Sequence, residues 1–224
     1  MINYTLIRSQ RRTAAIHIKN GGVEVRAPMK MPKHDIDRFV ASKEKWISDH
    51  LTQSQSRAEQ REAFTLDYGD AVTFRGVGYP LTAKDGKRAG FDGEQFYLPP
   101  GLAPEQMKST VVQIYRRLAK LHLTERAKQY AVLMNVSPTA FKINGAKTRW
   151  GSCSAKKSLN FSWRLVMADD AVIDYVTVHE LAHISEMNHS TGFWAVVAGV
   201  LPDYKEQQKR LKELQKRLKA ENWE

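Results

Sequence analysis

Residues 171–189 read AVIDYVTVHELAHISEMNH and bring His179, Glu180, His183 and His189 close together in the chain. Residues four apart on an α-helix are rotated by roughly 400°, so His179 and His183 lie on one face and can direct two imidazoles at one metal ion. Glu180 is near enough to hold a metal-activated water without being a ligand. This H-E-x-x-H spacing is typical of zinc hydrolases, in which the metal acidifies the water and the glutamate accepts its proton.

A catalytic zinc site also needs a third protein ligand. His189 lies six residues beyond His183 and would point away from the metal if the helix continued. We expect the helix to stop near residues 187–188, because an asparagine tolerates the left-handed conformation that a chain reversal often uses. His189 would then reach the same ion. A carboxylate on a following helix is the alternative third ligand, and Glu206 is the residue that fits this description.

An ordinary helix that carries solvated or core histidines is the other interpretation of the motif. The segment AVIDYVTV is apolar on nearly every side, which predicts burial, and buried imidazoles need polar partners. This context favours the metal site. The other histidines have no neighbour at ligand spacing, so we expect surface or packing roles for His17, His34, His50 and His122.

Residues 1–100 are predicted to form a β-rich N-terminal portion with a long helix. Strand-like residues 14–19 and 23–27 flank Asn20-Gly21-Gly22, which is typical of a hairpin turn. A helical pattern then runs from Lys33 to about Arg61, and strand-like residues return over 64–98. Pro99-Pro100-Gly101 is the expected domain boundary.

Residues 101–224 are predicted to form a mainly helical, zincin-like metallohydrolase domain with a small sheet beside the motif helix. The expected elements are a helix over 104–134, strands within 140–166, the motif helix capped by Asp169 and Asp170, and helices near 191 and over 203–219. The two portions together give an α+β fold.

Composition indicates a soluble globular protein, since 42% of the 224 residues are hydrophobic and 26% are charged. The net charge of +11 favours anionic partners, although the basic residues are spread over many segments. The single cysteine, Cys153, cannot form an internal disulfide, and the first residues have no secretory signal. We therefore expect a cytoplasmic protein without a membrane partner.

The run TRWGSCSAKKSLNFSWRLVMADDAVIDYVTVHELAHISEMNHSTGFW, about Arg149 to Trp194, resembles the YgjP-like family of predicted zinc-dependent metallopeptidases. Its motif helix is also similar to those of SprT-type and minimal gluzincin-like proteases. The resemblance implies that His179, His183 and His189 bind the metal and that Glu180 is the catalytic base. Outside this run the resemblance is loose.

The residues before the motif helix are expected to contribute to substrate binding. In zinc hydrolases a strand beside the motif helix commonly lies along the cleft and pairs with an extended substrate. Arg149, Trp150, Gly151 and Ser152 can form that wall, although core packing is the alternative for Trp150. Arg149 and Tyr204 are the candidates for stabilising an oxyanion.

The sequence thus predicts a zinc-dependent hydrolase, and specifically a metallopeptidase that cleaves a peptide or protein with a metal-activated water. One Zn²⁺ per chain is expected, with another divalent transition metal as the alternative. Hydrolysis of an anionic non-peptide substrate, such as a nucleotide phosphoanhydride, is a second hypothesis that the basic charge favours. A nucleic-acid-binding module with a structural zinc is the third.

Overall fold

The computed structural model describes residues 2–19 and 21–223 and confirms the α+β fold. The chain divides into two compact units, one of Met1–Phe64 with Lys219–Asn222 and one of Thr65–Leu218 with Trp223–Glu224. Within the described residues, no helix combines the length and apolarity that are needed to cross a membrane.

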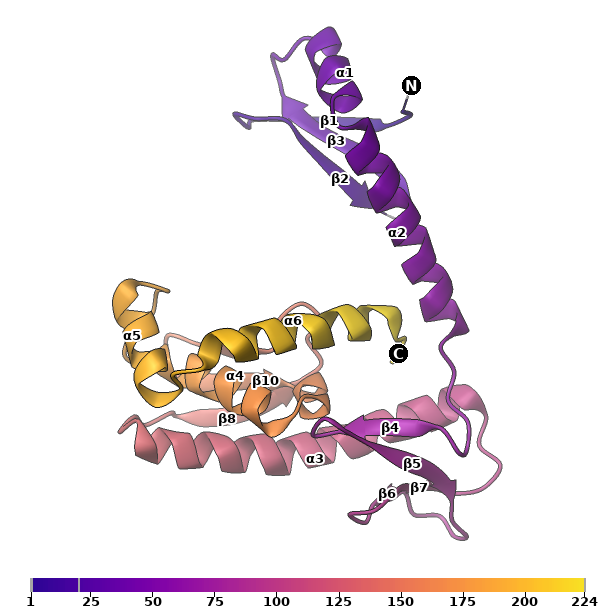
Figure 1. The fold of residues 1–224 in the computed structure, drawn as a ribbon, viewed down its shortest axis with the longest axis vertical. Helices are drawn as coiled ribbons and strands as arrows, with labels where there is room; N and C mark the ends of the chain where they lie inside the picture. The colour runs from indigo at the N-terminus through magenta and orange to yellow at the C-terminus, as the bar shows by residue number, and fades with distance from the viewer. Residues whose placement is uncertain (1, 20, 224) are drawn as a thin grey trace. The chain divides into compact units, whose positions relative to one another are not determined.

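The first unit is a three-stranded sheet with two helices packed on one face (Figure 1). The central strand β3 pairs in parallel with β1 and antiparallel with β2, which confirms the predicted hairpin, although Asn20 of its turn lies outside the described residues. Alternate side chains of β3 enter the core, where Val23, Val25 and Ala27 are buried. The elements are β1 (Thr5–Ser9), β2 (Ala15–Lys19), β3 (Gly22–Pro28), α1 (Lys33–Ala41) and α2 (Glu44–Ala63).

The predicted helix over residues 33–61 is broken into α1 and α2, and Ser42 explains the break. In a continuous helix the Lys43 N–H would bond to the Phe39 carbonyl. The Ser42 hydroxyl instead donates to that carbonyl at 2.7 Å, and the Lys43 N–H turns to the Val40 carbonyl at 3.0 Å. A serine side chain that competes for a backbone acceptor is a common cause of helix interruption.

Within the part of the chain that the structure describes, the second unit contains two small sheets and four α-helices. One sheet has the strand order β4-β5-β7-β6 and the other β8-β10-β9. The elements are β4 (Ala71–Phe74), β5 (Val77–Ala83), β6 (Gly90–Phe91), β7 (Phe96–Leu98), α3 (Pro104–Leu133), β8 (Ala140–Asn144), β9 (Gly151–Cys153), β10 (Ser158–Ser162), the 3-10 helix η1 (Trp163–Met167), α4 (Asp170–Ala182), α5 (Thr191–Val200) and α6 (Tyr204–Ala220).

The sheet of β4 to β7 belongs to the same compact unit as α3. Phe96 of β7 is fully buried, and its ring packs edge-on against Tyr115 of α3 with ring centroids 5.6 Å apart. The division therefore falls between Phe64 and Thr65, whereas the sequence suggested residue 100. The reason is that apolar side chains of these strands complete a core with the helix that follows them.

Paired polar side chains align α4 with α3, and α4 carries the histidine motif. Arg126 and Tyr130 of α3 bind the carboxylate of Asp174, with distances of 2.7 Å to Arg126 Nε and 2.9 Å to the Tyr130 hydroxyl. One turn earlier, His122 contacts Asp170 at 3.1 Å. Of the two predicted caps of α4, Asp169 is the N-cap and its side chain accepts a bond from the Val172 N–H, whereas Asp170 is the first residue of the helix.

Acidification is expected to destabilise the second unit through His122 and Asp170. Burial, reinforced by the charge of Arg75, lowers the pKa of His122 from 6.5, and the bond from Arg75 lowers the pKa of Asp170 from 3.8. The folded state therefore binds fewer protons than the unfolded state, so the stability that these groups contribute is present above their ordinary pKa values. This stability is lost as the pH falls through the pKa values that the two groups have in the folded state.

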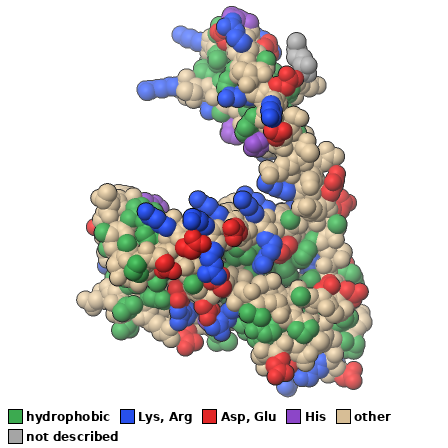
Figure 2. All heavy atoms as spheres, in the orientation of Figure 1, with side chains coloured by type: hydrophobic (Ala, Val, Ile, Leu, Met, Phe, Trp, Pro, Cys, Tyr) green, Lys and Arg blue, Asp and Glu red, His purple; other side chains and the backbone are tan. Residues whose placement is uncertain are grey.

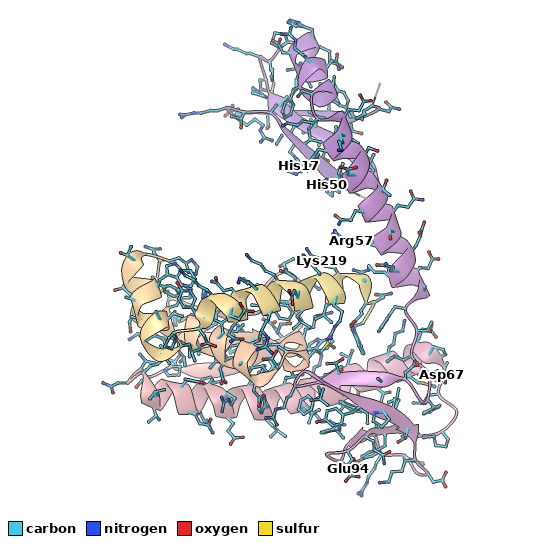
Figure 3. All side chains as sticks on the ribbon, viewed as in Figure 1. His17, His50, Arg57, Asp67, Glu94 and Lys219 are labelled. Atoms are coloured by element: carbon cyan, nitrogen blue, oxygen red, sulfur yellow. The ribbon has the colours of Figure 1, made fainter. Side chains whose placement is uncertain are left out.

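Thermal unfolding will test this expectation when it is measured at pH values that span the ordinary and the folded pKa values of His122 and Asp170. The midpoint temperature of unfolding should fall first below about pH 6.5, the ordinary pKa of a histidine such as His122. It should fall again below about pH 4, near the ordinary pKa of an aspartate such as Asp170. His122→Gln should make the first fall shallower. His50→Gln, at an exposed position on α2 (Figure 3), is the matched control and should leave the profile unchanged. Equal profiles for all three proteins would contradict the assignment to His122.

Candidate metal centre

The C-terminal end of α4 presents His179, Glu180 and His183 next to β9 and α5. The helix ends at Ala182 with His183 as its C-cap, which is earlier than the predicted stop near residues 187–188. The Glu186 N–H bonds back to the Ala182 carbonyl at 2.9 Å and closes the turn that follows. The Glu186 carbonyl lies 3.1 Å from His183 Nδ1. A donated Nδ1–H at this bond leaves Nε2 of His183 with a free lone pair.

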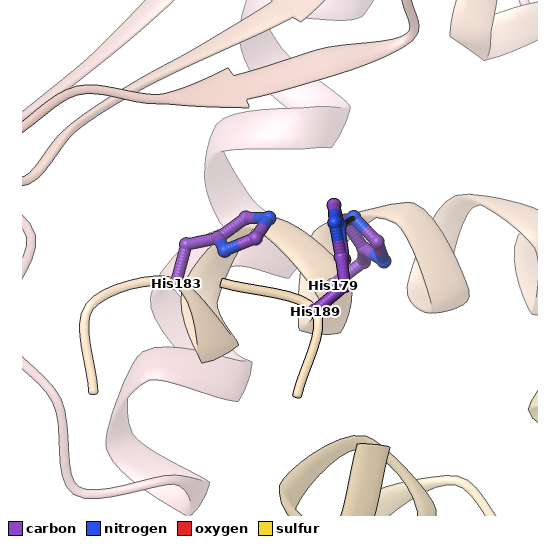
Figure 4. Close-up of side chains that lie close together, drawn as sticks. All are labelled: His179, His183 and His189. Carbon is purple, nitrogen blue, oxygen red and sulfur yellow. Dashed lines mark hydrogen bonds between the residues drawn. The ribbon is translucent and has the colours of Figure 1, made fainter. Parts of the chain in front are cut away.

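His189 returns to the end of α4 because the chain reverses between α4 and α5. Ser190 caps α5 by accepting a bond from the Phe193 N–H at 3.2 Å, which fixes the residue next to His189. The His189 Nε2 lies 3.0 Å from the His179 Nε2. Ligand atoms of all three imidazoles lie within 4.8 Å of one another, and Figure 4 shows the rings gathered at one place.

The electrostatics of His179 and His183 suit a cation. Burial, with the charges of His183 and His189, lowers the pKa of His179 to about 4, and burial also lowers the pKa of His183. Neutral imidazoles at neutral pH keep the lone pairs that a metal needs. Two lone pairs that face each other at 3.0 Å need a proton or a cation between them. Tetrahedral zinc with Zn–N bonds of 2.0–2.1 Å places its nitrogens about 3.3 Å apart, close to the 3.0 Å between His179 and His189, so a zinc ion fits these two donors, with His183 in reach of the same point.

Glu180 is buried against strand β9. Burial raises its pKa to about 7, while the positive charge of Arg149 and a bond from the Cys153 N–H act in the opposite direction. A Cβ on Gly151 would lie 2.5 Å from Glu180 Cγ and 2.6 Å from its Oε1. Only glycine at position 151 therefore allows the strand to approach the carboxylate this closely.

Strand β9 is the edge of its sheet, because the strand order is β8-β10-β9. A backbone carbonyl at the start of its pairing partner β10 accepts a hydrogen bond from the Ser154 N–H at 3.0 Å. A backbone N–H at the other end of β10 donates one to the Trp150 carbonyl at 2.8 Å. Backbone groups alternate along an antiparallel strand, so those of Gly151 and Cys153 face the other edge. At that edge the Cys153 N–H meets the Glu180 carboxylate.

A family model, the YgjP-like metallopeptidase domain, matches residues 12–214 of the chain. The chain belongs to the YgjP-like metallopeptidase family. It is therefore a metal-dependent hydrolase, and metallopeptidases use a divalent metal that is typically zinc.

Two solved structures are similar to part of this YgjP-like chain. The metallopeptidase zymogen abylysin of Pyrococcus abyssi is 21% identical, with a TM-score of 0.37 over 40% of this chain and 90% of that one. The metallopeptidase zymogen jannalysin of Methanocaldococcus jannaschii is 20% identical, with a TM-score of 0.37 over 41% of this chain and 94% of that one. No curated protein matches the chain significantly.

Some of the predicted site residues lie together in this YgjP-like structure, and others lie apart from them. It gathers the three histidines, and it places Glu180 against Gly151. Among the described residues, Glu206 lies outside the cluster of the three histidines. Its exposed carboxylate pairs with Lys209 at 3.2 Å. Tyr204, the other candidate for an oxyanion contact, stacks on a tryptophan ring.

Two aromatic residues, Phe193 and Trp194, contact the histidines and were not among the predicted site residues. Fully buried Phe193 lies within 4.9 Å, between ring centroids, of each of the three imidazoles. Trp194 stacks on His189 with ring centroids 5.8 Å apart, and Tyr204 stacks on Trp194 with ring centroids 5.2 Å apart. The adjacent aromatics four and five residues after His189 are the signal in the sequence that could have indicated this contact.

Proposed function

We propose that this protein is a zinc-dependent peptidase in which His179, His183 and His189 hold one zinc ion and Glu180 is the general base. The observation that carries the proposal is the gathering of three imidazole donors within 4.8 Å at the end of α4. Neutral imidazoles and a family of metallopeptidases support the same assignment.

Glu180 performs the proton transfers in this proposal. A bound zinc ion supplies an acidified water and polarises the carbonyl of the peptide. The Glu180 carboxylate accepts a proton from the attacking water and delivers it to the nitrogen of the leaving amine. Its pKa of about 7 suits both steps, because a base that is effective near neutral pH must also give the proton back. The Cys153 N–H orients the carboxylate.

The outer edge of β9, where Glu180 already accepts the Cys153 N–H, is the proposed site for the peptide backbone. An extended peptide can add to an exposed strand edge through backbone hydrogen bonds. Gly151 would offer its backbone groups at this edge, whereas those of Ser152 face β10, and Trp150 and exposed Arg149 lie at its beginning. A peptide bound there passes the Glu180 carboxylate, because Gly151 directly contacts Glu180.

Metal content of the purified protein tests the proposed ligands. Inductively coupled plasma mass spectrometry should find about one zinc per wild-type chain and a loss of that zinc in both His183→Ala and His189→Ala. His122→Ala, outside the cluster, is the matched control and should keep its zinc. Zinc retained by His189→Ala would remove His189 from the ligand set and return Glu206 to consideration.

A substrate comparison tests the proposed reaction on the zinc-loaded protein. Casein and a library of fluorogenic peptides should be cleaved, and the cleavage should stop after chelation and resume when zinc is added. Phosphate release from nucleoside triphosphates should be absent. Phosphate release without any peptide cleavage would replace the peptidase by the phosphoanhydride hydrolase that the basic charge favours.

A further inference from the structure

Helix α6 carries a row of lysines along one face. Lys205, Lys209, Lys212 and Lys216 are spaced alternately four and three residues apart, and all four are exposed. At 100° per residue they lie within about 60° of arc, so they form one stripe along the helix. We call these four residues the lysine stripe. Figure 2 shows Lys and Arg side chains gathered over α6, and Lys219 continues the spacing at the end of the helix (Figure 3).

The opposite face of α6 is packed, so the lysine stripe has a fixed direction. Gln207 is buried, and Leu211, Leu214 and Leu218 are half-buried along the side away from the lysines. The Gln208 side chain donates to the Tyr175 hydroxyl of α4 at 2.9 Å, and Arg210 pairs with Asp169 at 2.6 Å. These contacts hold α6 on the second unit and leave the lysine stripe directed outward.

The charge of the lysine stripe is largely uncompensated. Within the described part of the chain, its only ion pair is the exposed one between Lys209 and Glu206, at 3.2 Å. Like charges three and four residues apart on a helix destabilise it by a few tenths of a kcal/mol per pair. A surface that serves only solubility intersperses both signs, whereas α6 offers two glutamates, Glu206 and Glu213, against the four lysines of the stripe. The charge of the lysine stripe therefore favours the binding of an anionic partner.

We propose that the lysine stripe docks the phosphate backbone of a nucleic-acid duplex. The stripe spans twelve residues from Lys205 to Lys216, a rise of about 16.5 Å over eleven steps. One strand of a duplex carries a phosphate about every 3.4 Å, which is about five phosphates over that length. Four ammonium groups, about 4.5–6 Å apart along the helix and carried on flexible side chains, present a linear positive array to these phosphates. Lysine ammonium groups bind phosphates as point charges, so the contact is independent of base sequence.

The salt dependence of binding tests this proposal and does not depend on peptidase activity. Fluorescence anisotropy with a labelled 20-base-pair DNA should give a slope of log K against log[salt] of about −3.6 or steeper, from four phosphate contacts. Lys212→Gln/Lys216→Gln should make that slope shallower by about 1.8, because two contacts are lost. Lys212→Arg/Lys216→Arg, which keeps both charges, should retain the wild-type slope.

A matched control separates the stripe from the overall charge of the protein. Lys120→Gln/Lys128→Gln removes two exposed lysines from α3, with the same change in net charge, and should leave the slope within the experimental error. An equal decrease in both double variants would show binding by net charge alone and overturn the proposal. A labelled polyglutamate peptide provides the second comparison. If the α6 substitutions weaken polyglutamate binding and leave DNA binding unchanged, the stripe recognises acidic protein instead.

Discussion

Glu180→Gln is expected to lower kcat/KM for peptide cleavage by about 10²–10⁴-fold, the range that a positioned general base contributes. The glutamine keeps the size of the side chain but cannot accept the proton of the attacking water. Zinc content should remain at about one per chain, because the proposed ligands are the three histidines. Stability should be unchanged or higher, since a neutral amide replaces a buried carboxyl whose pKa burial has raised to about 7.

Steady-state kinetics, metal analysis and thermal unfolding of the same preparation measure these three effects. Glu125→Gln, an exposed position on α3, is the matched control and should behave as the wild type in all three. Loss of zinc together with activity would identify Glu180 as a metal ligand instead of a base. An active Glu180→Gln variant would falsify the proposed role of this carboxylate.

Gly151→Ala is expected to reduce peptide cleavage by about 10²-fold, because displacement of a catalytic group by about 1 Å has an effect of that size. The added Cβ would lie 2.5 Å from Glu180 Cγ and 2.7 Å from Cδ, distances at which one of the two elements must move. Either the carboxylate rotates away from the metal centre or β9 moves off α4. Both movements separate the base from the strand that is proposed to hold the substrate, while zinc binding remains.

Gly199→Ala is the control for the substitution itself. No atom outside its own neighbourhood lies within 4 Å of a Cβ at this position on α5, so the variant should keep full activity. It should also gain up to about 1 kcal/mol of stability, because alanine is the better helix former. The double variant Gly151→Ala/Glu180→Gln should be no less active than Glu180→Gln alone, since both changes act on one carboxylate. Additive losses, or a fully active Gly151→Ala, would contradict the close packing of Glu180 on β9.

Several elements could be predicted from the sequence because they depend on residues that are near in the chain. His179 and His183 share a face because helical periodicity alone places residues four apart together. The β2–β3 hairpin and the cap of α4 by Asp169 likewise follow from turn and capping residues that act within a few positions. The break between α1 and α2 escaped prediction because a serine in a helical pattern does not show which carbonyl its hydroxyl will choose.

The amino-acid sequence by itself determined the motif helix, its two histidines on one face and the glutamate beside them. Only the tertiary structure decided that α4 ends at Ala182, that His189 returns to within 3.0 Å of His179, and that Gly151 packs on Glu180. The physical reason is the range of the interactions. Helical periodicity is local, whereas the position of His189 depends on how α5 packs against α4, and the approach of β9 depends on its pairing with β10.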